Sequence, residues 1–439
     1  MSDPRPSRRF VLRETKMLAP LGVHNFRLLW LGSMLSYLGG QLTLIAFPWL
    51  ILKVTGDPLA MGSVLAVASV PRALFMVFGG AVTDRFSPRL VMLWVNWLRG
   101  FLMFGLAPVI YFELMDVWMV FVVAGIFGVI DAFYWPASSA ILPRLLPPAL
   151  LPAGNSLVQG MGQISMMLGP VIAGFVITLF ATEAGDNGPG NDMPGIAVVF
   201  LVDGVGFVVA AVALAMIRLP PQSAAGSTSG FARSILEGFG VTWRDMPVRL
   251  ITVAFTLFSL FFRGPYIVGI PILCDQRFDD GALAFGLIGS AFGAGSLLGL
   301  VLAGSLPRLP DRFLGTLILL DFIVLGGSFV VFALAPDLPW LMLASALGGI
   351  ADGYMIILLV SWLQIRVPTE FLGRVMGVIM VFNQGVAPVS AAAAGALMRV
   401  SVEGVFLGAA AVLITLSVAG MALPDIRRMG FAESSQAPR

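Results

Sequence analysis

The chain has 439 residues, of which 58% are hydrophobic and only 11% are charged, and its formal net charge is +2. A soluble domain carries about 25% charged residues, so this chain has too little charge to cover a globule in water. The composition excludes a soluble enzyme, a disordered chain and a nucleic-acid-binding protein. It indicates a protein that lies in the lipid bilayer.

Residues 1–24 are polar and basic, and no small-residue cleavage site follows a short apolar core. We therefore expect a cytoplasmic tail rather than a signal peptide. Twelve apolar runs follow, each long enough to cross a bilayer as a helix. They lie at about 26–52, 59–82, 90–112, 117–140, 155–180, 196–217, 249–273, 282–305, 313–335, 340–363, 375–398 and 404–423.

The runs predict an all-α membrane protein with 12 transmembrane helices in two six-helix bundles. Residues 128–133 in the fourth span match residues 349–354 in the tenth, in the same orientation, which is typical of a parallel internal repeat. The predicted units are a tail (1–24), a first bundle (25–217), a linker (218–248), a second bundle (249–423) and a second tail (424–439).

The linker contains a small-residue stretch at 223–230, which predicts a flexible connection. Phe231, Ile235, Phe239 and Trp243 then recur at every fourth position. This spacing predicts a short amphipathic helix on the cytoplasmic surface of the membrane. We interpret it as a passive spacer between the halves, with a partner-binding helix as the alternative.

Basic residues indicate the orientation of the spans. If the N-terminus is cytoplasmic, 20 lysines and arginines lie in cytoplasmic segments, and only Lys53, Arg277 and Arg399 lie in outside segments. Lysine and arginine accumulate in the cytoplasmic loops of membrane proteins. The sequence therefore predicts that both termini are cytoplasmic.

Scarce residues exclude several kinds of site. Cys274 is the only cysteine and His24 the only histidine, which excludes an intrachain disulfide and a zinc site of ordinary composition. Neither Lys16 nor Lys53 ends a phosphate-binding glycine loop. We expect no catalytic residue, no metal and no cofactor, and we expect that the protein is not an enzyme.

Seven charged residues lie inside the predicted spans away from their ends, and a charge at a helix centre costs at least about 2.5–3.5 kcal/mol. They are Arg72, Arg99, Asp131, Asp203, Arg263, Asp321 and Asp352. Arg99 and Asp131 fall at similar depth at 1.5 Å per residue, so they are a candidate ion pair, and Arg72 is a competitor for the same acid. The alternative is a buried pair that only locks the helix packing.

The other embedded charges receive different roles. Arg263 lies near the middle of the seventh span, where it could neutralise an anionic substrate or a cavity carboxylate. Asp352 is a candidate for proton coupling together with Asp131, Arg99 and Arg72. Asp203 and Asp321 are assigned to peripheral packing.

Residues 80–89, between the second and third spans, resemble a signature of the major facilitator superfamily. Gly80, Asp84, Arg85 and Arg89 occupy its glycine, acidic and basic places, and Ser87 departs where glycine is usual. The resemblance covers essentially the whole chain and implies transport by alternating access, with Asp84 controlling the cytoplasmic gate. In the second half the copy at 304–313 is degraded, because Arg308 replaces the acid.

The fifth span resembles the exporter motif of that superfamily. Gly169, Pro170 and Gly174 match it, with Ser165 and Ala173 at two glycine positions. Within the superfamily this motif implies efflux rather than uptake.

Other segments resemble the branch that holds enterobactin exporters and macrolide efflux pumps, namely 25–30, 71–72, 131–133, 136–137 and 147–148. Relatives often have Gly-Asp where this chain has Gly39-Gly40. Proton coupling, if present, must then depend on Asp131 or Asp352.

These observations predict a monomeric secondary transporter of the bacterial inner membrane, driven by the proton gradient. It would export an amphipathic small molecule, a drug or a siderophore-like metabolite, by proton antiport. The substrate would enter between spans 1, 4, 7 and 10, and its partners would be that substrate and the lipid bilayer. The alternatives are an uptake symporter, a lysophospholipid flippase and a membrane scaffold that does not transport.

Overall fold

The computed structural model describes residues 18–182, 191–218, 231–305 and 314–422, apart from the side chains of 76–85, 135, 231–237 and 369–370. Within these residues the chain is helical, and 12 helical segments are long and apolar enough to cross a membrane. The predicted fold class is confirmed. Most of the expected N-terminal tail, the flexible connection, Arg308 and the C-terminal tail lie outside the described residues.

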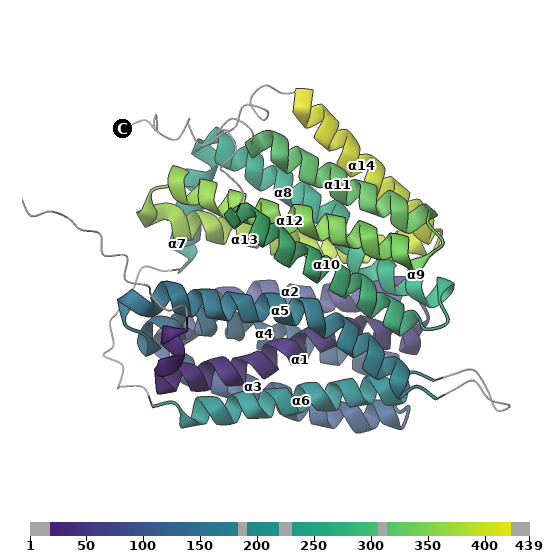
Figure 1. Cartoon of the computed structure of the whole chain (residues 1–439), viewed down its shortest axis with the longest axis horizontal. Helices are drawn as coiled ribbons and strands as arrows, with labels where there is room; N and C mark the ends of the chain where they lie inside the picture. Colours follow the sequence, from purple (N-terminus) through teal and green to yellow (C-terminus); the bar gives the residue numbers. More distant parts are fainter. Residues whose placement is uncertain (1–17, 183–190, 219–230, 306–313, 423–439) are drawn as a thin grey trace, which may run out of the picture.

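Six long helices form the first bundle, at the bottom of Figure 1. They are α1 (His24–Thr55), α2 (Pro58–Arg85), α3 (Pro88–Tyr111), α4 (Val117–Leu145), α5 (Leu151–Leu179) and α6 (Met193–Met216). Short 3-10 turns, η1 (Ala19–Gly22) and η2 (Pro148–Leu150), precede α1 and α5. Exposed leucine, valine, phenylalanine and tryptophan side chains cover the outer faces, as expected of a surface that contacts lipid.

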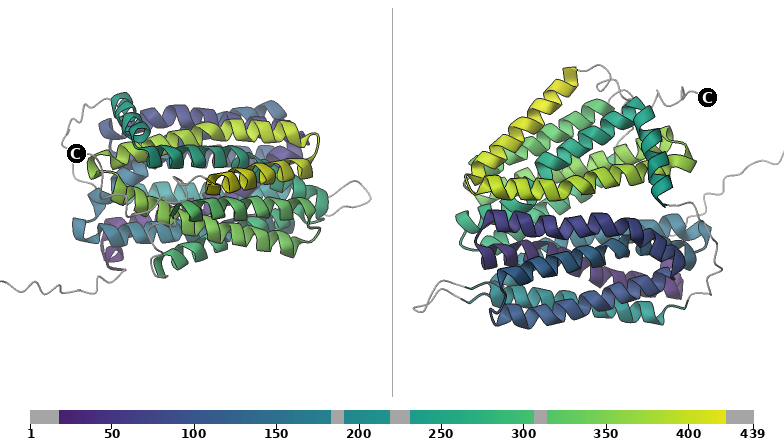
Figure 2. Two further views of the ribbon diagram at one scale, coloured as in Figure 1. Left: turned by 90° about the horizontal axis from the view of Figure 1, so that it is seen from above. Right: turned by 180° about the vertical axis from the view of Figure 1, so that it is seen from behind.

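The second bundle lies above the first in Figure 1, and the view from behind in Figure 2 shows the same separation. Its helices are α8 (Met246–Gly264), α9 (Ile270–Arg277), α10 (Gly281–Ser305), α11 (Leu314–Leu334), α12 (Leu338–Arg366), α13 (Thr369–Met398) and α14 (Val402–Ala422). The seventh span consists of α8, the π-helical turn η3 (Pro265–Gly269) and α9. Pro265 cannot donate a backbone hydrogen bond, which accounts for the break in the helix.

The linker helix α7 (Phe231–Arg244) packs against the second bundle. The ring of Phe239 stacks on that of Trp243, with centroids 4.5 Å apart, and the Trp243 ring lies 5.8 Å from Phe382 of α13. The sequence predicted a helix lying on the membrane surface. In the structure these aromatic side chains pack on α13 and Thr242 is fully buried, so one face of α7 contacts the second bundle, and its position relative to the membrane stays a prediction.

The two bundles touch along two helix pairs, α5 with α10 and α2 with α13. Glycine allows the close approach: a Cβ at Gly286 of α10 would lie 2.3 Å from the carbonyl oxygen of Pro170, and one at Gly174 would lie 2.5 Å from that of Ala282. The Ser290 hydroxyl also accepts a hydrogen bond of 2.8 Å from the Val171 amide. The exporter motif of the fifth span therefore lies at the interface between the bundles.

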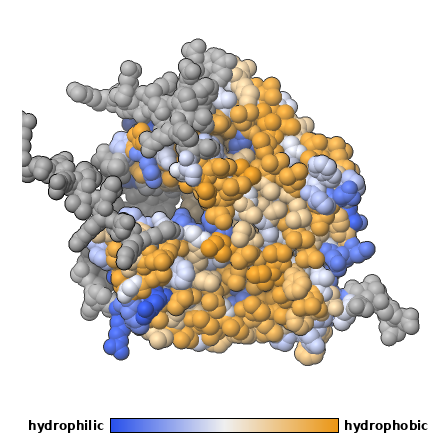
Figure 3. Space-filling view, viewed as in Figure 1, coloured by the Kyte–Doolittle hydropathy of each residue, from blue (hydrophilic) through white to orange (hydrophobic). Residues whose placement is uncertain are grey.

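The two ends of the molecule differ. Figure 3 shows a hollow between the bundles at the end where α7 lies, and we call this the open end. At the opposite end, where α1 is followed by α2, Gly62 of α2 and Gly395 of α13 lie with their Cα atoms close together, and ion pairs join the bundles. We call this the closed end.

Candidate functional site

A cavity of about 780 Å³ lies between the two bundles. Its volume is within the range of about 300–1,000 Å³ that is typical of pockets for drug-sized ligands. Helices α1, α2, α4 and α5 of the first bundle and α8, α10, α12 and α13 of the second all contribute to its wall. Most lining side chains are apolar, and the embedded charges lie among them.

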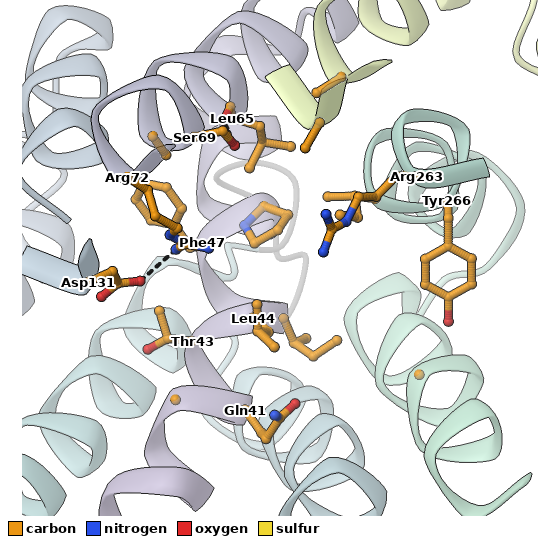
Figure 4. Close-up of a pocket in the computed structure, with 18 of the residues that line it drawn as sticks. Gln41, Thr43, Leu44, Phe47, Leu65, Ser69, Arg72, Asp131, Arg263 and Tyr266 are labelled. Carbon is orange, nitrogen blue, oxygen red and sulfur yellow. Dashed lines mark hydrogen bonds and ion pairs between the residues drawn. The ribbon is translucent and has the colours of Figure 1, made fainter. Parts of the chain in front are cut away.

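Asp131 of α4 is held by two guanidinium groups on the first-bundle wall, and Figure 4 shows its contact with one of them, that of Arg72. Arg72 Nη2 lies 2.5 Å from Asp131 Oδ2, and Arg99 of α3 forms an ion pair with Oδ1. The Arg99 guanidinium also lies over the rings of Tyr134 and Phe207, at 5.3 and 5.1 Å. The predicted ion pair of Arg99 and Asp131 is confirmed, and Arg72 binds the second oxygen of the same carboxylate rather than replacing Arg99.

Asp203 of α6 lies at the same cavity, although the sequence assigned it to peripheral packing. Its side chain is fully buried, and its Oδ2 accepts a hydrogen bond of 2.5 Å from the Thr43 hydroxyl. A Cβ at Gly39 would lie 2.0 Å from Asp203 Oδ1, so the carboxyl group occupies space that only glycine leaves free. Asp203 is therefore a functional candidate that sequence analysis missed, because the sequence does not show which way α6 faces.

Arg263 lies on the opposite wall, near the end of α8, and points into the cavity (Figure 4). Its Nη1 donates to Gln384 Oε1 at 2.6 Å and to Asn383 Oδ1 at 3.3 Å, both on α13. No described carboxylate forms an ion pair with it. Asn383 and Gln384 were not among the candidates predicted from the sequence, although two adjacent amides inside an apolar run were a usable signal.

Asp352 of α12 lines the cavity on the second-bundle wall. Asp321 of α11 is 5% exposed, and its Oδ1 has no hydrogen-bond partner in the described part of the chain. The two carboxyl groups interact electrostatically, so Asp321 lies inside the second bundle near Asp352. Neither acid forms an ion pair with a described basic residue.

Aromatic side chains of the seventh span form an apolar strip beside Arg263. Phe258 and Phe262 stack with centroids 4.9 Å apart, and Phe262 and Tyr266 stack at 5.4 Å. These residues are spaced by four, so they share one helical face that borders the cavity. The strip offers contact to the apolar part of an amphipathic molecule.

Two ion pairs cross between the bundles at the closed end. Lys53 Nζ of α1 lies 2.6 Å from Asp275 Oδ1 of α9 and 3.3 Å from Asp192 Oδ2 of its own bundle. Arg399, after α13, donates from Nε to Asp57 Oδ1 at 2.7 Å. This hydrogen bond from Arg399 lowers the pKa of the Asp57 carboxyl group below its usual value.

The motif between the second and third spans is only partly described. Gly80, Asp84 and Arg85 lie in α2, but their side chains are outside the described part. Arg89 of α3 donates to the carbonyl oxygens of Leu214 and Ala215, at 2.7 and 2.6 Å. It thereby binds the last turn of α6, where carbonyl groups have no partner within the helix.

The described residues contain no group of three or more His, Cys, Asp or Glu side chains that could hold a metal ion. The cavity instead offers a mixed surface: an apolar aromatic strip, three guanidinium groups and three carboxyl groups. Such a surface can bind an amphipathic molecule and can also bind or release protons.

Comparisons with known proteins agree on one family. The model of the Major Facilitator Superfamily matches residues 29–392. Macrolide efflux protein A of Streptococcus pyogenes is 21% identical over 410 residues, which cover 92% of this chain and 97% of that protein. The multidrug efflux pump Tap of Mycolicibacterium fortuitum is 24% identical over 410 residues, which cover 90% of this chain and 94% of that protein.

Solved structures with the same fold include the nucleoside transporter NupG, with a TM-score of 0.69, 12% identity, and coverage of 91% of this chain and 98% of that one. A bacterial homologue of the human lysosomal transporter Spinster, in an inward-facing and occupied conformation, has a TM-score of 0.66 and 11% identity, with coverage of 96% and 99%. At these identities the likeness concerns the fold alone.

Proposed function

The chain belongs to the Major Facilitator Superfamily, and on this basis we propose that it exports an amphipathic small molecule, a drug or a siderophore-like metabolite, across the bacterial inner membrane. Relatives named macrolide efflux protein A and multidrug efflux pump Tap align over 90% or more of this chain, which supports efflux of a drug-like molecule. The observation that carries the proposal is a drug-sized cavity between the bundles that is open at one end, closed at the other and lined by embedded acids.

Alternating access follows from the two different ends. The distribution of 20 basic residues against three supports a cytoplasmic location for the open end, so this conformation would load substrate from the cell interior. Release would require the closed end to open and the open end to close. The ion pairs of Lys53 with Asp275 and of Arg399 with Asp57 would then have to break.

Proton antiport supplies the energy in this proposal. Asp131 forms ion pairs with both Arg72 and Arg99 in this conformation, and these pairs favour its ionised form. Protonation from the other side of the membrane would remove the negative charge and release both guanidinium groups. Asp352 is the second candidate, because it lines the cavity without an ion-pair partner among the described residues.

Everted membrane vesicles with an acidic interior test this function. A pH-sensitive dye would report proton release when macrolides, cationic dyes, catecholate siderophores or lysophospholipids are added. We expect at least one drug or siderophore to release protons with the wild type and with Asp337→Asn, an exposed loop acid used as the control. Asp131→Asn should abolish the release while folded protein remains in the membrane.

Retained gradient-driven export by Asp131→Asn would remove that residue from the coupling mechanism and direct attention to Asp352. Accumulation of the compound inside whole cells would instead identify an uptake symporter. Movement of lysophospholipid alone in liposomes would identify a lipid flippase. A scaffold would tolerate simultaneous neutralisation of Asp84, Asp131 and Arg263 without a change in phenotype.

A further inference from the structure

We propose that Asp131 and Asp203 share one proton, and that Arg99 pairs with whichever of the two carboxyl groups is ionised. The proton resides on Asp203 while Arg99 binds Asp131, which is the arrangement in this structure. In the alternative arrangement the O–H bond of Asp203 breaks, an O–H bond forms on Asp131, and Arg99 turns to Asp203. This inference rests on the proposed proton coupling and adds Asp203 to it as a second group that carries the proton.

Two buried atoms of the first bundle, one donor and one acceptor, lack hydrogen-bond partners. Arg99 Nε is a buried donor without an acceptor, and Asp203 Oδ1 is a buried acceptor without a donor in the described part of the chain. Buried polar groups without partners are uncommon in folded proteins and call for a functional explanation. Arg99 and Asp203 both line the cavity, and these two atoms have opposite hydrogen-bonding needs.

Arg99 lies against the face of α6 that carries Asp203. The Arg99 guanidinium lies over the ring of Phe207, which follows Asp203 by four residues and therefore shares its face of α6. Helices α3 and α6 are in close contact there, since a Cβ at Gly100 would lie 3.1 Å from a Val208 methyl group. Arg99 and Asp203 also interact electrostatically. A change of side-chain rotamer is the smallest motion that would join them.

The surroundings of Asp203 suit an acid that ionises only when Arg99 approaches. From α1, the Thr43 hydroxyl donates to Oδ2, and Gly39 leaves room for Oδ1. Arg99 of α3 is the charged group that interacts with Asp203, and beside that guanidinium lie Asp131 and Tyr134 of α4. Tyr37 of α1 is a further titratable group, and it interacts with Tyr134. Helix α5 carries no charged residue.

The exchange explains how a buried guanidinium tolerates protonation of Asp131. Removing one partner from a buried ion pair leaves an uncompensated charge, which is strongly destabilising. Because Asp203 would take over Arg99, the net charge of these groups is the same in both arrangements, and the more deeply buried of the two guanidinium groups keeps a carboxylate partner. Protonation of Asp131 at the cavity wall would also change the contact between α1 and α6, which meet through the hydrogen bond of Thr43 with Asp203.

A double-mutant cycle on the purified protein tests the exchange. In Asp131→Asn, Arg99 should pair with Asp203, and in Asp203→Asn it should keep Asp131, so each single variant retains one carboxylate for Arg99. The double variant retains none. We expect its unfolding temperature to fall by more than the sum of the two single effects, or no folded protein to be recovered.

The matched control is Asp131→Asn combined with Asp321→Asn, because Asp321 is an equally buried acid in the other bundle. In this control the falls in unfolding temperature caused by the two single substitutions should add. The proposal would be overturned if the effects of the Asp131 and Asp203 substitutions were also additive. It would also be overturned if both double variants lost equally more unfolding temperature than the sum of their single variants.

Thr43→Val gives a readout that a purely structural role would not move. This variant keeps the size of the side chain and removes the donor to Asp203, which disfavours the ionised form of Asp203. The pH midpoint at which the shared carboxyl band disappears from infrared spectra should rise by about one unit, as expected for one lost hydrogen bond to a charged group. An unchanged midpoint would overturn the proposal.

Both measurements use purified protein and require no transport. If the Asp131 and Asp203 substitutions are non-additive but no compound is exported in vesicles, the exchange is retained and the proposed function is refuted. Export with an additive cycle would retain the function and refute the exchange.

Discussion

Replacing Asp275 with asparagine should favour opening of the closed end, because this carboxylate joins α9 to α1 across the two bundles. Lys53 Nζ lies 2.6 Å from Asp275 Oδ1, and the side chains are 32% and 35% exposed. Exposed ion pairs contribute about 0.2–1 kcal/mol, and the partial burial here places this pair near the upper limit. A loss of about 1 kcal/mol changes the ratio of the two conformations about fivefold.

Distances between spin labels would measure this ratio. Cysteines introduced at Arg144 of α4 and Ile365 of α12 lie near the open-end termini of two helices in different bundles. Cys274, the only native thiol, is fully buried and should not react with the label. We expect Asp275→Asn to increase the fraction of molecules with a short distance at the open end about fivefold where that fraction is small.

Asp192→Asn provides the control, because Lys53 also lies 3.3 Å from Asp192 Oδ2 but this pair stays within the first bundle. It should leave the distance distribution unchanged. If both variants shift the distribution equally, or if Asp275→Asn has no effect, the ion pair does not hold the closed end and the reasoning is refuted.

Three further changes test other contacts between the parts of the molecule. The pKa of Asp57 is lowered by its hydrogen bond from Arg399, so this pair should strengthen closure above about pH 4 and lose that effect as the pH falls through the lowered pKa. Label distances across the closed end should therefore be constant from about pH 5 to 8 and lengthen only below about pH 4. Gly286→Val should also open the closed end, because its Cβ would lie 2.3 Å from the Pro170 carbonyl oxygen. Phe382→Ala should release α7, since two aromatic contacts of about 0.5–1.5 kcal/mol each are lost; faster limited proteolysis of the linker would show this.

Each of these predictions has a control in the same chain. Gly408→Val places its side chain in open space and should not shift the distances. Arg399→Gln should abolish the change seen at low pH, and its persistence would assign that change to another group. Phe75→Ala removes an exposed ring elsewhere and should leave proteolysis of the linker unchanged.

The fold was predictable because its main determinant is local. A run of apolar residues long enough to cross the bilayer must be helical, since a lipid environment leaves no other partner for the backbone. The seventh span shows the limit of this reasoning. Its apolar run predicted one helix, whereas Pro265 divides it into α8, η3 and α9 and places Arg263 and Tyr266 at the cavity.

Contacts in the site were predictable only where two residues on adjacent spans lie at the same depth in the membrane. Arg99 and Asp131 fall at the same depth on adjacent spans, and each needs a partner of opposite charge, so their ion pair followed from the sequence. Asp203 did not, because its role depends on the rotation of α6 about its own axis. The pair of Lys53 and Asp275 was also missed, since it joins residues 222 positions apart across a fold whose bundle contacts the sequence does not show.

The arrangement of charge in the cavity suits the amphipathic substrate of the proposed function. In the first bundle, Arg72 and Arg99 both bind Asp131 within their own wall. In the second bundle, Arg263 is bound only by neutral amides, and Asp352 has no ion-pair partner among the described residues. The second-bundle wall thus offers one charge of each sign beside an aromatic strip. An amphipathic molecule with either charge would find a partner there without disturbing the proposed proton site of the first bundle, so specificity under the proposed function would depend on size and apolar contact more than on charge.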